Sequence, residues 1–334
     1  MELNKFYGKS FLKEIDFSKG DLETLINFAA DLKKKEKHGI PQRFMSGKHI
    51  ALIFEKQSTR TRSAFTVAAT KLGANVEYLN KNDLQLGSKE SVEDTAKVLG
   101  TMFDGIAYRG DHQDTVESLG EHANIPIWNA LTNEWHPTQM LADFLTIKEH
   151  LGTYKGKTIT FVGDGRNNVA HSLLVTGAIL GANINILAPE SLQPEISVQK
   201  TAYDIAKGSG SKLMITSDIK KGIAYSDAVY TDVWCSMGEE DALDERVNLL
   251  SDYQVNQDLM DMTGKEDTIF LHCLPAIHDK STDVGKLAYE KFNVDGLEVT
   301  DDVFRSTASK VFDQAENRMH TIKALIAVTC GNVH

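Results

Sequence analysis

Hydroxyl and guanidinium side chains alternate shortly after an apolar segment of the sequence. The segment His49–Phe54 is followed by Ser58-Thr59-Arg60-Thr61-Arg62. The next residues predict a helix capped by Ser58 or Thr59 and ended by Gly73. Its apolar face consists of Ala64, Phe65, Ala68, Ala69 and Leu72. The N–H groups of the helix start, the hydroxyls and the Arg60 guanidinium can together bind one phosphate. A capped surface helix with solvated arginines is the alternative.

Two further candidates follow predicted strands in the first half of the chain. Arg109 follows Tyr108 at the end of one strand. His136-Pro137-Thr138-Gln139 precedes a helical pattern, with Pro137 suited to the first helical position and His136 near the cap. Ligands of open parallel sheets bind beyond the carboxyl ends of the strands. We therefore expect these residues to lie at the same edge of the sheet as the helix start that can bind phosphate.

In the second half, Gly163-Asp164-Gly165-Arg166-Asn167-Asn168 follows a predicted strand and opens a helix. This is the setting of a dinucleotide-binding fingerprint, but Asn168 replaces the third glycine, so nicotinamide binding is only weakly indicated. A nucleotide-binding Walker A motif is also missing, since Gly8-Lys9-Ser10 lacks the earlier glycine.

Two more polar segments follow predicted strands of the second half. Asp232–Gly238, with the sequence DVWCSMG, offers a carboxylate, a hydroxyl and a methionine in one short loop. His272-Cys273-Leu274-Pro275-Ala276 places an imidazole beside a thiol. A buried cysteine is most often inert packing, whereas a cysteine beside a cation at a strand end is reactive.

Strand and helix patterns alternate along the whole chain. The predicted strands are 49–54, 75–79, 105–108, 125–128, 158–162, 183–187, 212–216, 228–231 and 268–271. This alternation predicts an α/β fold with two Rossmann-like domains, each a mostly parallel sheet covered by helices on both faces. The polar segment Leu151–Lys157 marks the boundary. We expect one domain over residues 1–150 and a second over 151–317, with a last helix, 318–334, packing back on the first.

Composition narrows the function classes. The chain has 334 residues, 41% of them hydrophobic and 25% charged, and a formal net charge of -11. This charge argues against nucleic acid or an anionic membrane as a partner. The three cysteines lack C-x-x-C spacing and the eleven histidines lack an H-E-x-x-H pattern, so we expect no metal site. With no apolar leader or spanning segment, we expect a cytoplasmic protein.

Taken together, the motifs resemble those of the aspartate and ornithine carbamoyltransferase family. Ser-Thr-Arg-Thr-Arg, His-Pro-Thr-Gln and Asn317-Arg318-Met319-His320 are features of the family, whereas DVWCSMG and His-Cys-Leu-Pro are features of its ornithine branch. The aspartate branch has no SMG loop and has His-Pro-Leu-Pro-Arg where this chain has His272–Ala276.

The resemblance implies the substrates and the residues that bind them. Carbamoyl phosphate would be held by Ser58, Thr59, Arg60, Thr61, Arg109, His136, Pro137, Thr138, Gln139, Cys273, Leu274 and Arg318. Gln85 would reach it from a neighbouring subunit, since the family forms trimers or multiples of trimers. Ornithine would be held by Asn168, Asp232, Ser236 and Met237, the first two meeting its α-amino and α-carboxylate ends. No cofactor is implied.

The implied reaction is attack of the ornithine δ-amine on carbamoyl phosphate, which gives citrulline and phosphate. Arg60 and Arg109 would neutralise the phosphate, and His136 and Thr61 would donate to the carbonyl oxygen. Deprotonating the amine at neutral pH costs roughly 4 kcal/mol if its pKa is not lowered. Asp232, His272 and Cys273 are the candidate proton acceptors, and the sequence does not decide among them.

The sequence leaves several alternatives open. A nicotinamide-dependent dehydrogenase, a carbamoyltransferase for a related amine and a non-catalytic anion-binding protein are the other functions considered. Arginine biosynthesis and arginine degradation by the deiminase pathway would use the same residues in opposite directions.

Overall fold

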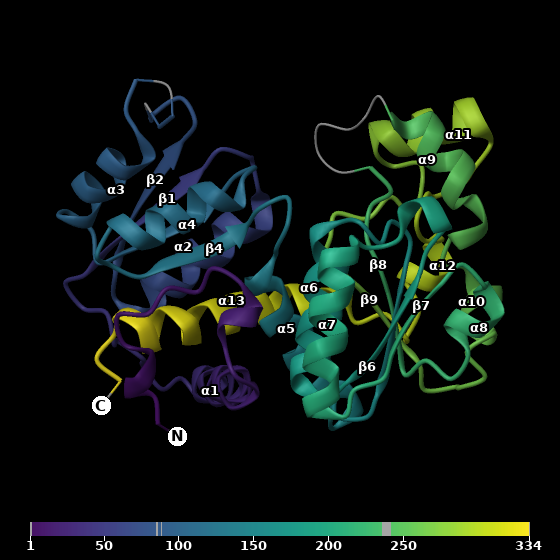
Figure 1. Ribbon diagram of the computed structural model, residues 1–334, viewed down its shortest axis with the longest axis horizontal. Coiled ribbons are helices and arrows are strands. Elements are labelled where there is room, and N and C mark those ends of the chain that lie inside the picture. Colours follow the sequence, from purple (N-terminus) through teal and green to yellow (C-terminus); the bar gives the residue numbers. More distant parts are fainter. Residues whose placement is uncertain (1, 85, 88, 236–241, 334) are drawn as a thin grey trace. The chain divides into compact units, whose positions relative to one another are not determined.

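The computed structural model describes residues 2–84, 86–87, 89–235 and 242–333. The chain divides into two compact units, each built around its own sheet (Figure 1). The first unit comprises Met1–Leu145 and Glu316–His334, and the second comprises Thr146–Ala315. Among the described residues, no helix has both the length and the apolar character needed to cross a membrane.

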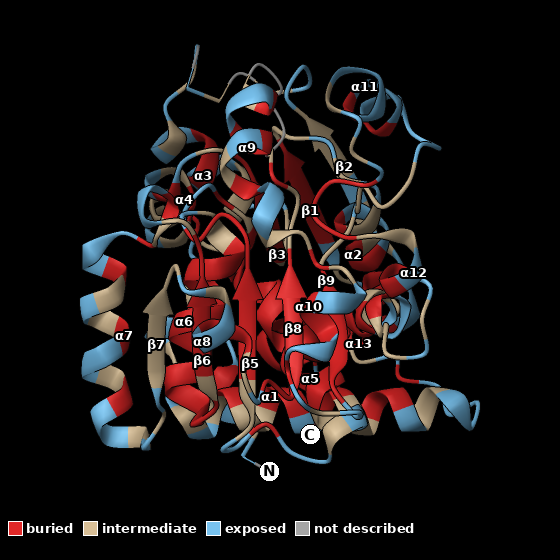
Figure 2. Cartoon of the chain, turned by 90° about the vertical axis from the view of Figure 1, so that its right-hand side faces the viewer, coloured by how far each residue is buried: buried red, intermediate tan, exposed pale blue. Residues whose placement is uncertain are grey.

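A four-stranded parallel sheet, in the order β2-β1-β3-β4, forms the centre of the first unit. The strands are β1 (His49–Phe54), β2 (Asn75–Asn80), β3 (Gly105–Arg109) and β4 (Ile127–Leu131). Every residue of β3 is buried, so both faces of the sheet are covered there. The edge strand β2 is less buried (Figure 2). The other edge, β4, is protected by a bridge between Phe11 and Trp128.

Helices from both ends of the chain belong to the first unit. They are the short 3₁₀ helices η1 (Asn4–Phe6) and η2 (Glu14–Asp16), α1 (Lys19–Lys37), α2 (Thr59–Leu72), α3 (Val92–Gly100), α4 (Gln113–His122), the start of α5 (Pro137–Leu151) and most of α13 (Val311–Cys330). Ser18 and Asp21 form a capping box at the start of α1. Thr329 of α13 accepts a hydrogen bond from the Trp128 indole over 3.1 Å, which fixes the end of α13 against β4.

The second unit contains a five-stranded parallel sheet in the order β7-β6-β5-β8-β9. Its strands are β5 (Thr158–Val162), β6 (Asn183–Leu187), β7 (Leu213–Thr216), β8 (Ala228–Thr231) and β9 (Ile269–His272). Its helices include α6 (Asn168–Leu180), η3 (Glu190–Leu192), α7 (Ile196–Ser209), α8 (Ile219–Ile223), α9 (Leu243–Leu250), η5 (Ser251–Tyr253), α10 (Gln257–Asp261), α11 (Asp283–Phe292) and α12 (Asp301–Phe304). Helix α6 is buried from Val169 to Leu180, which makes it a core helix.

Each sheet has a topological switch point, where the chain changes the side on which it adds strands. In the first unit β2 lies on one side of β1, and β3 and β4 lie on the other. In the second unit β6 and β7 lie on one side of β5, and β8 and β9 lie on the other. Loops that follow the two strands at such a point diverge and leave room for a ligand. The loops after β1, β3, β5 and β8 are therefore the candidate binding loops.

The structure confirms the predicted fold class and all nine predicted strands, with two clear errors in position. The prediction that a strand starts at Ile125 was wrong: β4 begins after Pro126, which cannot donate a hydrogen bond to the sheet. The prediction that the last helix starts at Arg318 was also wrong, since α13 begins at Val311. Its first turns are mostly polar and lack the apolar repeat on which the prediction relied.

Candidate active site

Helix α2 begins at the turn that carries the alternating hydroxyls and guanidinium groups. Ser58 has extended backbone angles, and its Oγ accepts a hydrogen bond from Thr61 N over 3.1 Å, so Ser58 is the N-cap. Gly73 ends the helix in the left-handed region, with a φ of 91°. The half-buried Arg60 lies in the first turn. A positive helix end and a guanidinium group therefore follow β1 directly.

Arg318 of α13 joins this turn to the start of α5. It is 4% exposed, and its Nη2 donates to Thr61 Oγ1 over 3.3 Å and lies 3.5 Å from Thr138 Oγ1. Its Nη1 donates to Gln139 Oε1. Asp143 Oδ1 accepts a hydrogen bond from Gln139 Nε2 over 2.7 Å, which turns the amide oxygen toward Arg318. Three segments far apart in the sequence thus meet at one guanidinium group.

His136 and Arg109 are buried in the same unit. Helix α5 begins at Pro137, which confirms its predicted place at the first helical position next to His136. Burial, together with the positive charges of Arg318 and Arg109, holds the pKa of His136 well below its usual value. The imidazole is therefore neutral at pH 7, with one N–H to donate and one nitrogen to accept.

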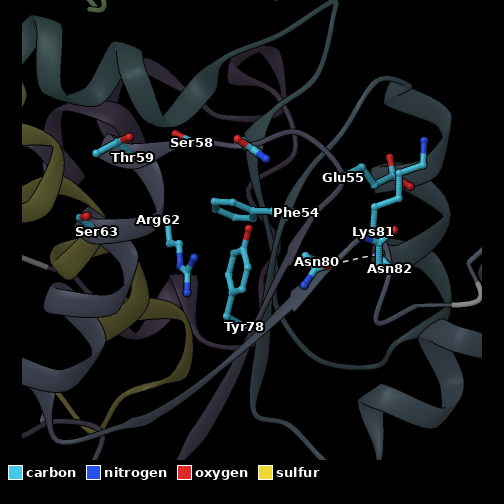
Figure 3. A pocket seen from close by; sticks show the side chains of 11 residues that line it. Phe54, Glu55, Ser58, Thr59, Arg62, Ser63, Tyr78, Asn80, Lys81 and Asn82 are labelled. Carbon is cyan, nitrogen blue, oxygen red and sulfur yellow. Dashed lines mark hydrogen bonds between the residues drawn. The ribbon is translucent and has the colours of Figure 1, made fainter.

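A cavity of about 810 Å³ opens beside the cap of α2 (Figure 3). Residues of β1, the following loop, α2 and the β2 region line it, among them Phe54, Ser58 and Thr59. Arg62, the second arginine of the motif, also lines this cavity, with its guanidinium carbon 3.5 Å from the centre of the Tyr78 ring. This contact is a cation–π interaction, so Arg62 stacks on a ring of β2.

In the second unit, Asp232 follows β8 and Cys273 follows β9. The Cys273 thiol donates a hydrogen bond to Asp232 Oδ1 over 3.1 Å, and Val233 N donates to the same oxygen over 2.8 Å. Asn167 Nδ2 lies 3.4 Å from Asp232 Oδ2. Desolvation raises the pKa of Asp232, and the nearby His272 and the Cys273 hydrogen bond partly oppose this rise. The carboxylate therefore connects the loops after β5, β8 and β9.

His272 is fully buried at the end of β9 and is held on both ring nitrogens. Its Nδ1 accepts a hydrogen bond from Leu274 N over 2.8 Å, so the ring proton is assigned to Nε2. Nε2 lies 3.2 Å from Oε1 of the fully buried Glu298, which also accepts from Ile277 N over 2.6 Å. The imidazole is thus fixed in one tautomer and one orientation.

Asn168 and Leu274, the remaining candidates of this unit, are placed by the start of α6 and by an unusual backbone conformation. Asn167 caps α6, since its Oδ1 accepts from Ala170 N over 2.7 Å, and Asn168 is the first residue of that helix. Leu274 has a φ of 61°, which is rare for a residue other than glycine. Its hydrogen bond to His272 helps to hold this conformation.

The candidate residues fall into two groups, one in each unit. Within the first unit, contacts link Ser58 with Thr61, and Arg318 with Thr61, Thr138 and Gln139. Within the second unit, Asp232, His272, Cys273 and Leu274 are neighbours. Cys273 and Leu274, expected from the resemblance to hold carbamoyl phosphate, belong to the second unit. Gln85, Ser236 and Met237 lie outside the described residues.

Several polar residues that contact the candidates are not indicated by the sequence motifs, among them Asn167 and Glu298. Asn167 was noted only as part of the glycine-containing turn, although an Asn before a helix is a common capping signal. Glu298 lies 26 residues beyond His272 in sequence and belongs to no motif, so only the fold reveals its contact with the imidazole.

Among the residues that the structure describes, two groups of side chains have donors suited to a metal ion. The ligand atoms of Asp232, His272 and Cys273 lie within 4.8 Å of one another, as do those of His278, Asp279 and Asp301. In the first group both imidazole nitrogens already have partners within the protein. This arrangement opposes metal coordination by His272, which needs a free nitrogen lone pair.

Comparison with known proteins gives matches over nearly the whole chain. Residues 9–149 match the carbamoyl-P binding domain of the aspartate/ornithine carbamoyltransferase family model. Residues 155–329 match the Asp/Orn binding domain of the same family.

Individual relatives are similar over their full length. The chain is 58% identical to a catabolic ornithine carbamoyltransferase of Staphylococcus aureus (strain MRSA252), covering 99% of both chains. It is 59% identical to the catabolic enzyme of Streptococcus ratti, covering 98% of this chain and 97% of the relative. Among solved structures, ornithine carbamoyltransferase from Pyrococcus furiosus is 41% identical with a TM-score of 0.90, covering 98% of this chain and 99% of that chain. The anabolic enzyme from Campylobacter jejuni is 35% identical with a TM-score of 0.84, covering 96% and 98%.

Proposed function

This chain belongs to the aspartate/ornithine carbamoyltransferase family, and we propose that it transfers the carbamoyl group between carbamoyl phosphate and the δ-amine of L-ornithine. The products of the forward reaction are L-citrulline and phosphate. The observation that carries this proposal is the contact of Arg318 with both Thr61 and Gln139. It brings three anion-binding segments of the sequence together in one unit, as binding of a phosphorylated substrate requires.

Carbamoyl phosphate is assigned to the first unit. Its phosphate accepts hydrogen bonds from the start of α2 and is neutralised by Arg60 and Arg109. The neutral His136 and the Thr61 hydroxyl donate to the carbamoyl oxygen as negative charge develops there. The low pKa of His136 supports this role, because a neutral donor leaves the positive charge of the site to the arginines. Cys273 and Leu274 of the second unit are assigned to the carbamoyl group.

L-Ornithine is assigned to the second unit. We assign its α-ammonium group to the Asp232 carboxylate, because the two charges are opposite, and its α-carboxylate to the side-chain amide of Asn168, which can donate hydrogen bonds. Ser236 and Met237 complete the proposed set. The switch point between β5 and β8 supports the assignment, since Asn168 begins the helix after β5 and Asp232 lies in the loop after β8, where the chain diverges.

The attacking amine loses its proton to the hydrogen-bonded pair of Asp232 and Cys273, beside the fixed imidazole of His272. The thiol and the carboxylate are hydrogen-bonded to each other, so a proton accepted by one can move to the other without crossing solvent. Glu298 acts through His272 by holding the imidazole in one tautomer.

The physiological direction follows from the relatives. The two relatives at 58% and 59% identity are both named catabolic, whereas the relative named anabolic is 35% identical. We therefore assign the chain to arginine degradation by the deiminase pathway, in which citrulline and phosphate are the substrates. The same residues serve both directions, since catalysis lowers one common barrier.

Assembly and location are part of the same proposal. A cytoplasmic homotrimer, or a multiple of trimers, places Gln85 of one copy at the carbamoyl phosphate of the next. The cavity beside Ser58 and Thr59 supports this arrangement, because it leaves space next to the proposed phosphate site for a segment of a neighbouring copy. Residues 1–150 with 318–334 form the proposed carbamoyl phosphate-binding domain, and 151–317 the ornithine-binding domain.

Amine specificity tests the proposal. Initial rates with L-ornithine, L-lysine, N-acetylornithine and putrescine are compared at saturating carbamoyl phosphate. We expect a strong preference for L-ornithine, because putrescine lacks the α-carboxylate and acetylation removes the positive charge that Asp232 binds. A preference for putrescine would assign the chain to a related amine instead.

A further inference from the structure

A buried tyrosine connects the ends of the two strands at the switch point of the first unit. The Tyr108 hydroxyl donates a hydrogen bond to Glu55 Oε2 over 2.7 Å. Tyr108 is fully buried near the end of β3, and the half-buried Glu55 is the first residue after β1. Neither residue belongs to the set assigned to a substrate above.

The backbone around this pair is constrained in three ways. Glu55 N donates to Arg109 O over 2.8 Å, so the loop that leads to Ser58 is tied directly to Arg109. The pairing of β3 with β4 shifts register between Tyr108 and Arg109, and such irregularities re-aim the side chain that follows. Gly110 leaves no room for a side chain, because a Cβ there would lie 2.1 Å from the Tyr108 hydroxyl oxygen and 2.4 Å from Glu55 Oε2.

The hydrogen bond from Tyr108 matters because Glu55 carries a negative charge close to the proposed phosphate site. Glu55 lines the same cavity as Ser58 and Thr59, at the edge of the sheet proposed to bind a phosphate dianion. A carboxylate at this edge repels the anion, and the repulsion grows when the carboxylate is free to rotate toward it. The Tyr108 hydroxyl holds one carboxylate oxygen in place and stabilises its negative charge.

We propose that Tyr108 is a positioning residue for carbamoyl phosphate binding: its hydroxyl holds the Glu55 carboxylate in a fixed orientation and sets the loop before Ser58 against Arg109. The inference rests on the proposed function. It differs from a general packing role because the effect acts through the charge of Glu55. Loss of the hydroxyl therefore harms binding of the anion and not of the amine, and removal of the carboxylate charge relieves the harm.

Steady-state kinetics of three variants test the inference. Tyr108→Phe is expected to raise the KM for carbamoyl phosphate and the inhibition constant of inorganic phosphate by about tenfold, with the KM for L-ornithine unchanged. Glu55→Gln alone has a small effect, since the amide oxygen still accepts from Tyr108. The double variant Tyr108→Phe, Glu55→Gln binds carbamoyl phosphate more tightly than Tyr108→Phe, because the freed charge is gone.

Tyr253→Phe is the matched control, since the Tyr253 hydroxyl donates over 3.0 Å to Ser217 O in the second unit. It is expected to leave the KM for carbamoyl phosphate unchanged. Gly110→Ala provides a second disruption of the pair and is expected to raise that KM as well. Unchanged anion affinity in Tyr108→Phe, or a double variant no better than Tyr108→Phe, would overturn the inference while the wild-type enzyme still forms citrulline. Failure of the wild-type enzyme to form citrulline would overturn the proposed function instead.

Discussion

The Cys273 thiol donates a hydrogen bond to Asp232 Oδ1 over 3.1 Å, across the ends of two neighbouring parallel strands. This pairing distinguishes Cys273 from an inert packing residue, because desolvation already raises the pKa of the carboxylate that it contacts. Cys273→Ala keeps the loop backbone, which remains available to the carbamoyl group, and removes only the thiol. We expect about tenfold weaker L-ornithine binding and a lower kcat, with carbamoyl phosphate binding nearly unchanged. Unchanged ornithine affinity, rate and pH profile would show that Cys273 only fills space, and Asp232→Asn would then be the decisive variant.

Arg60→Lys tests the phosphate assignment at the start of α2. Lysine keeps the charge but loses the planar pair of donors that binds two phosphate oxygens. We expect kcat/KM for carbamoyl phosphate to fall by about a hundredfold while the melting temperature stays the same. Arg305→Lys is the control, since Arg305 is exposed and pairs with Asp301 in the second unit. Near-normal kinetics of Arg60→Lys would show that Arg60 does not bind the phosphate.

Asn167 combines a cap of α6 with a contact to Asp232, and the two roles can be separated. Asn167→Ala is expected to cost about 1 kcal/mol of stability and to raise the KM for L-ornithine. Asn256→Ala removes a similar cap, since Asn256 Oδ1 accepts from Leu259 N over 2.9 Å at the start of α10. The control should lose similar stability, measured by urea unfolding, and keep its KM. Equal KM values for L-ornithine in both variants would show that Asn167 serves only as a helix cap.

His320 predicts a dependence of stability on pH. Burial and the nearby Lys323 lower its pKa to about 4, although Glu36 and Glu316 oppose this. Because the unfolded chain takes up this proton near its ordinary pKa of 6.5, the stability contributed by neutral His320 is present above pH 6.5. It is lost as the pH falls from 6.5 toward 4. We expect His320→Gln to show a shallower loss of unfolding free energy across this range, measured by urea unfolding at several pH values. If the unfolding free energy of His320→Gln depended on pH as steeply as that of the wild type, the lowered pKa of His320 would be contradicted.

The sequence predicted those parts of the fold that depend on local patterns. The strands, the cap at Ser58 or Thr59 and the helix start at Pro137 are predictable because apolar runs, capping residues and proline act over a few neighbouring residues. The start of α13 was missed because its first turns carry no apolar repeat. The family resemblance named the candidate residues, but contacts such as Glu298 with His272 and Glu55 with Tyr108 join segments without any common motif. Such contacts depend on strand order, which a single sequence encodes only through the complete packing of the core.

The central claim is that this chain catalyses carbamoyl transfer between carbamoyl phosphate and L-ornithine. The most direct measurement is citrulline formation by the purified full-length protein from these two substrates alone, with no nucleotide added. We expect rapid, enzyme-dependent citrulline formation, and phosphate-dependent formation of ornithine when citrulline is supplied instead. Hydrolysis of carbamoyl phosphate without citrulline, or no turnover by a folded protein, would contradict it.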